Sequence, residues 1–85
     1  MDVIRRVELA RDRELAVGSM PQPTALEIRR VEAMWQGVHR TYFYLVSLDA
    51  EGNGIGGTFH ESLSNAEAQA EYQFGVSPDR WCAVQ

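Results

Sequence analysis

The spacing of apolar and polar positions changes near Arg40. Before it, apolar side chains recur at steps of three and four residues, as in Val31, Met34, Trp35 and Val38. Such spacing places side chains on one face of an α-helix. After it, the segment TYFYLVSL (41–48) carries apolar side chains on both faces and is rich in aromatic residues, as in a central strand. The pattern predicts helices first and a sheet afterwards.

Residues 2–17 are predicted to form the first helix, with Asp2 as its N-cap and Gly18 just beyond its end. A hairpin turning at residues 11–13 is the alternative, because apolar residues also alternate there with polar ones. Residues 18–23 contain two prolines and are expected to form a linker. The chain is therefore predicted to be one domain, with a helical arm (1–17), a linker (18–23) and a core (24–85).

The second predicted helix spans residues 24–39. It begins at the segment TALE, where the Thr24 hydroxyl and the Glu27 carboxylate can satisfy each other's backbone amides as a capping box. Gly37 weakens the end of this helix, which is expected to stop near His39.

The C-terminal half is predicted to fold as strand, strand, helix and strand. Residues 55–60 pair back on 41–48, and the segment SNAE (64–67) opens a helix to Phe74 that buries Leu63, Ala66, Ala70 and Phe74. Residues 80–84 form a last strand, placed antiparallel beside 41–48. The expected fold class is α+β, with two N-terminal helices, then β-hairpin–α–β, and a small three-stranded antiparallel sheet packed against helices.

The stretch DAEGNGIGG (49–57) admits three interpretations. Asp49, Glu51, Asn53 and Gly54 match the first half of a calcium loop, but its twelfth position is His60 instead of a bidentate glutamate. The glycine spacing matches a dinucleotide fingerprint, but no helix is predicted to follow it. A turn between two strands accounts for the same residues without these conflicts.

The charges are divided unevenly along the chain, whose net charge is −4. Residues 1–40 hold seven arginines and six acidic residues, whereas residues 41–85 hold Arg80 and six acidic residues. The arginines occur in pairs within two copies of the pentapeptide IRRVE, at 4–8 and 28–32. Nucleic-acid binders usually show clustered cationic charge, and here acidic residues are interleaved with it.

Candidate catalytic groups are few. Cys82 is the single cysteine, so no internal disulfide forms, and a Cys82–His60 pair has no spacing that supports nucleophilic chemistry. His39, His60 and Cys82 lack the paired spacing of a zinc site. No enzyme activity, metal, cofactor or small-molecule substrate is predicted. Without a transmembrane or secretory segment, the expected location is cytoplasmic.

The sequence thus favours a small non-catalytic protein-interaction module, such as a bacterial or phage adaptor or inhibitor, that binds a partner protein or forms a homodimer. The alternatives are a nucleic-acid-binding regulator that uses the arginine-bearing helices, and a weak calcium-binding module at residues 49–61. Tryptophan, methionine and arginine are enriched at interface cores. In so small a domain, the apolar stripe that holds Met34 and Trp35 is first of all expected to be core. As an interaction surface, the predicted residues are Arg29, Arg30, Met34, Trp35, Val38 and Arg40, with Ile4, Arg5, Arg6 and Val7 in the N-terminal arm.

Overall fold

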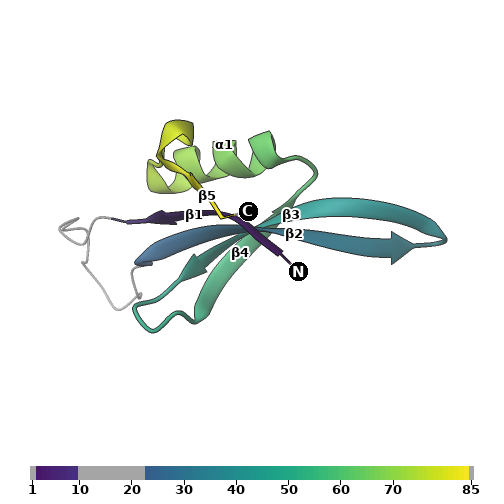
Figure 1. Ribbon diagram of the computed structural model, residues 1–85, viewed down its shortest axis with the longest axis horizontal. Coiled ribbons are helices and arrows are strands. Elements are labelled where there is room, and N and C mark those ends of the chain that lie inside the picture. Colours follow the sequence, from purple (N-terminus) through teal and green to yellow (C-terminus); the bar gives the residue numbers. More distant parts are fainter. Residues whose placement is uncertain (1, 10–22, 85) are drawn as a thin grey trace.

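The computed structural model describes residues 2–9 and 23–84 as an antiparallel sheet with one helix on it (Figure 1). The sheet has five strands in the order β4-β3-β2-β1-β5. In chain order the elements are β1 (Asp2–Glu8), β2 (Ala25–Trp35), β3 (Val38–Leu48), β4 (Gly54–His60), α1 (Leu63–Phe74), the 3-10 turn Pro78–Arg80 and β5 (Cys82–Ala83).

The fold is mostly β, and the prediction of two N-terminal helices is wrong. Residues 2–8 form β1 instead of the start of a helix, while 10–17 and most of the predicted linker lie outside the described residues. The segment 24–39 forms β2, a turn and the start of β3. The two IRRVE copies lie in β1 and β2, which pair antiparallel.

Alternate residues of β2 contact different partners. Leu26 and Ile28 are fully buried in the main hydrophobic core, whereas Ala25 lies in a second buried cluster with Val46 and Leu48, and Glu27 is buried between two arginines. This division between alternate residues has the period of a pleated strand. Thr24 and Glu27 do not form the predicted capping box, because Thr24 N–H donates to the Leu48 carbonyl and Glu27 binds two arginines.

Gln36 and Gly37 form the two-residue turn that joins β2 to β3. Their φ angles are 51° and 79°, so both lie in the left-handed region. This is the backbone of a type I′ hairpin turn, in which glycine is strongly favoured. The sequence predicts that Gly37 weakens a helix end; in the structure it reverses the chain between two strands.

The main core lies between the sheet and α1. Close packing of the helix is possible because Ala66 and Ala70 are fully buried and carry only a methyl group. Each large aliphatic side chain buried here contributes about 1.5–3 kcal/mol to folding. The buried members of this core are Val7, Leu9, Leu26, Ile28, Leu45, Ala66, Ala70 and Val76.

Several C-terminal predictions are confirmed. The strand predicted at 41–48 belongs to β3, residues 55–60 pair back on it within β4, and α1 ends at Gly75 with the predicted alanines buried. The cap is corrected by two residues, because the Ser62 hydroxyl, not that of Ser64, accepts the Asn65 amide.

The predicted sheet order is also wrong. Cys82 and Ala83 pair antiparallel with Arg6 and Arg5 of β1, so the last strand lies at the edge opposite β4. The sequence pattern predicts a helix where β1 lies, so the expected sheet lacks β1, the strand with which β5 pairs.

Candidate functional site at the end of the β2–β3 hairpin

The β2–β3 hairpin extends past the rest of the sheet and past α1 (Figure 1). We call its outer part, residues 31–42, the arm; it is distinct from the N-terminal arm (1–17) that the sequence predicts. Met34 and Trp35 are each 67% exposed near its end, and Val38 is 51% exposed. Three of the predicted interaction residues thus lie near the end of a hairpin instead of on a helix.

The pairing register assigns the arm residues to two sides. Directly opposed residues of an antiparallel pair project to the same side, and successive residues to opposite sides. Trp35 faces Val38, whereas Met34 faces His39. We call the first set the Trp35 side; it comprises Val31, Ala33, Trp35, Val38, Arg40 and Tyr42.

The two sides differ in chemistry. The Trp35 side is apolar and aromatic apart from Arg40. The Met34 side also carries Glu32, His39 and Thr41, and its His39 Nε2 lies 2.9 Å from Glu32 Oε1. The apolar character of the arm is therefore concentrated on one side of the ribbon.

The Trp35 side continues onto the sheet face that α1 does not cover. Tyr44 pairs with Arg29 in β2 and with Phe59 in β4. The two aromatic rings stack with centroids 4.5 Å apart and an interplanar angle of 22°. Phe59 is 61% exposed, so the apolar surface reaches from the end of the arm to β4.

Gly57 makes room for this aromatic stack. A Cβ atom at Gly57 would lie 2.6 Å from the ring atoms and hydroxyl of Tyr44. The ring therefore occupies the space above the glycine. Tyr42, Tyr44 and Phe59 were not among the predicted site residues, although the aromatic residues two apart at 42 and 44 indicate a shared strand face.

Arginines on the same sheet face are paired with carboxylates. Glu27 lies between Arg6 and Arg29, with N–O distances of 2.6 and 2.7 Å. Arg6 also contacts Glu8 at 2.8 Å. The hydrogen bond to Glu8 is the largest cause of a raised pKa for Arg6, desolvation opposes it, and Glu27 adds to it.

The other predicted arginines have different surroundings. Arg30 Nη2 lies 3.0 Å from Asp2 Oδ2, on the side of β2 opposite Arg29. Arg5 Nη1 donates to the Ile4 carbonyl at 2.9 Å. Arg40 is exposed and opposes Ala33 on the Trp35 side of the arm. Of the predicted arginines, Arg40 is the one that belongs to the arm.

The apolar residues predicted in the N-terminal arm belong to the core. Val7 is 5% exposed, and Ile4 packs against the cluster that Val7 helps to form. These two side chains stabilise the core and do not form part of the exposed surface at the end of the β2–β3 hairpin.

The 49–53 segment forms the turn between β3 and β4. Asp49 Oδ1 accepts the backbone amides of Glu51 and Asn53, both at 2.9 Å. The chain enters this turn from a strand, whereas a calcium loop of this type follows a helix. Within residues 2–9 and 23–84, no three His, Cys, Asp or Glu side chains gather in a way that could hold a metal ion.

Cys82 and His60 are not brought together. They lie on β5 and β4, at opposite ends of the strand order. Cys82 is exposed, and His60 Nε2 is 2.7 Å from Thr58 Oγ1. This geometry does not support the nucleophile–base pair considered from the sequence.

Comparison with known proteins gives no match to a family model, a curated protein or a solved structure. In the part of the chain that the structure describes, no helix combines the length and the apolar character needed to span a membrane.

Proposed function

We propose that this protein is a non-catalytic protein-interaction module that binds its partner, another protein or a second copy, through the Trp35 side of the arm. The supporting observation is that Trp35, Val38 and Phe59 leave half or more of their surface exposed along one continuous side. Contiguous exposed apolar surface on a small soluble domain is typical of interaction sites.

The residue types on this side also fit a protein partner. Tryptophan, tyrosine and arginine carry much of the binding energy at protein interfaces, and Trp35, Tyr42 and Arg40 share the arm. The ion pairs of Arg6, Arg29 and Arg30 leave less free cationic charge for a phosphate backbone. Protein binding is therefore favoured over nucleic-acid binding.

The test compares Trp35→Ser with Met34→Ser. Both side chains are 67% exposed, adjacent in sequence and apolar, but they lie on opposite sides of the ribbon. Neither change should alter the free energy of unfolding by more than about 0.5 kcal/mol, as is usual for surface positions. Wild type and both variants are used to capture partners from a native lysate, and their masses are measured by sedimentation.

The proposal predicts that a captured protein, or a dimer, is kept by Met34→Ser and lost by Trp35→Ser, which should weaken binding by about 2 kcal/mol or more. Equal retention by both variants, with both folded, would exclude the Trp35 side as the binding surface. Loss by Met34→Ser alone would assign binding to the opposite side of the arm.

A further inference from the structure

The strand β4 forms one end of the sheet. It contains seven residues, and six of them are exposed. In the described part of the chain, β4 pairs with β3 on one side and with no strand on the other. The strand at the opposite end, β5, has two residues. The long open edge of this sheet is therefore β4.

Nothing in the side chains of β4 blocks the approach of another strand. Natural proteins usually protect a long edge strand with lysine or another charged residue, or with proline. The sequence GIGGTFH of β4 contains no acidic residue, lysine, arginine or proline. A register irregularity at Ile55 limits the regular edge to Gly56–His60. This backbone edge can accept an extended segment, which is a common mode of peptide recognition.

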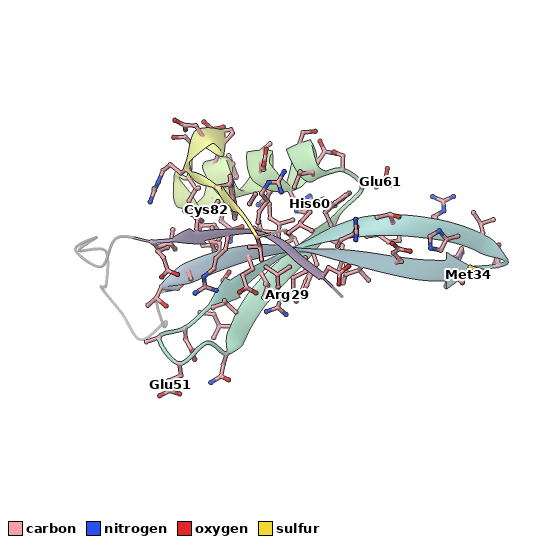
Figure 2. All side chains as sticks on the ribbon, viewed as in Figure 1. Arg29, Met34, Glu51, His60, Glu61 and Cys82 are labelled. Atoms are coloured by element: carbon pink, nitrogen blue, oxygen red, sulfur yellow. The ribbon has the colours of Figure 1, made fainter. Side chains whose placement is uncertain are left out.

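The surroundings of β4 are acidic. Glu51 lies in the turn before the strand and Glu61 directly after it, at opposite ends of β4 (Figure 2). The helix α1, which packs against β3 and β4, carries two further acidic residues, Glu67 and Glu71. Arg80 is the arginine of residues 41–85, and it donates to the Glu8 carbonyl beside β5, at the edge of the sheet opposite β4.

These charges discriminate between occupants. A second copy paired antiparallel along β4 would place Glu51 of one chain near Glu61 of the other. Like charges at close range oppose such association. A segment that carries lysine or arginine would meet opposite charge at both ends of the strand. Phe59, exposed on the open face, would contact an aliphatic side chain of that segment.

We propose that the β4 edge binds an extended basic segment of a partner protein by strand addition. The segment alternates aliphatic residues with lysine or arginine, and its backbone pairs with Gly56–His60. This site shares Phe59 with the apolar face described above, but its backbone contacts lie outside the arm, so it does not depend on the function proposed for Trp35.

The test is a titration of the full-length ¹⁵N-labelled protein with a capped peptide of alternating arginine and valine. The expected result is a set of saturable amide shifts centred on Gly56, Gly57 and Thr58. The Glu51→Gln/Glu61→Gln double variant changes exposed side chains and should bind about two- to fivefold more weakly. Trp35→Ser should bind as tightly as wild type, which separates this site from the arm.

Two control peptides decide whether strand addition is the mode. A glutamate–valine peptide removes the charge complementarity, and an N-methylated arginine–valine peptide removes the backbone donors. Both should bind at least tenfold more weakly. Equal binding of either control, shifts confined to the arm, or no shifts with the arginine–valine peptide would overturn the proposal. Shifts at β4 that depend on protein concentration, with a dimer in sedimentation, would overturn it in favour of a second copy.

Discussion

Gly57 and Gly56 are adjacent in β4 but differ in what surrounds them. Tyr44 occupies the space where a Gly57 side chain would be, whereas a Cβ at Gly56 would meet no atom within 4 Å. A side chain at position 57 would therefore clash with Tyr44, whereas position 56 has room for one. The sequence shows two equivalent glycines, and only the cross-strand register distinguishes them.

We predict that Gly57→Ala destabilises the protein by about 1–3 kcal/mol, because the new methyl group displaces the Tyr44 ring from its stack on Phe59. The matched control, Gly56→Ala, should be neutral or stabilising by up to about 1 kcal/mol, since alanine restricts the unfolded chain. Urea denaturation measures both free energies, and the aromatic proton shifts of Tyr44 report the ring displacement. Equal effects of the two substitutions would contradict the observed register.

At the scale of the elements, α1 begins at a single side-chain cap. Ser62 is extended, with φ −144°, and its hydroxyl accepts the Asn65 amide at 3.1 Å. Ser64, the cap that the sequence suggested, lies inside the first turn of the helix. Both serines can cap a helix and both are followed within three residues by alanine or asparagine, so the local sequence alone does not decide between them.

Ser62→Ala should therefore cost about 1 kcal/mol of stability, because it leaves an amide of the first turn without its partner. Ser64→Ala is the control. The Ser64 hydroxyl lies 3.2 Å from the Ser62 hydroxyl, and both are exposed, so this substitution should change stability by less than about 0.5 kcal/mol. Thermal or urea unfolding distinguishes the two variants. A larger loss for Ser64→Ala would place the helix start where the sequence suggested.

The hairpin keeps Trp35 and Val38 on one side although the predicted element is wrong, and it places Met34 on the opposite side. Trp35 and Val38 are three residues apart, which matches one face of a helix. The same separation is that of the residues flanking a two-residue hairpin turn, and these also project to one side. The spacing therefore predicted their proximity under either structure, but it did not predict that the arm would be free of the core.

At the scale of the whole molecule, the second half of the chain was more predictable than the first. The strands β3 and β4 and the helix α1 have compositions that agree with their structures, so local patterns identified them. In β1 and β2, arginine and glutamate occupy many positions, and both residues favour helices. Pairing with neighbouring strands and burial of Leu26 and Ile28 against α1 outweigh that preference.

The candidate site depends on the same tertiary arrangement. Phe59 joins Tyr44 only because β4 pairs with β3 in one register, and that pairing requires long-range contacts that no local pattern encodes. The open edge of β4 likewise follows from the strand order. Both proposed surfaces therefore require that residues 25–48 form one long antiparallel hairpin within the sheet.

A nuclear Overhauser spectrum of the labelled protein tests that hairpin most directly. Trp35 and Val38 flank the two-residue turn as a hydrogen-bonded pair, and hydrogen-bonded and non-hydrogen-bonded pairs then alternate along the hairpin. The Hα atoms are close together in the non-hydrogen-bonded pairs. The structure predicts Hα–Hα cross-peaks between Met34 and His39 and between Glu32 and Thr41. Continuous strong amide–amide cross-peaks between successive residues from 24 to 39, without those cross-strand peaks, would show a helix and contradict the structure and both proposed surfaces.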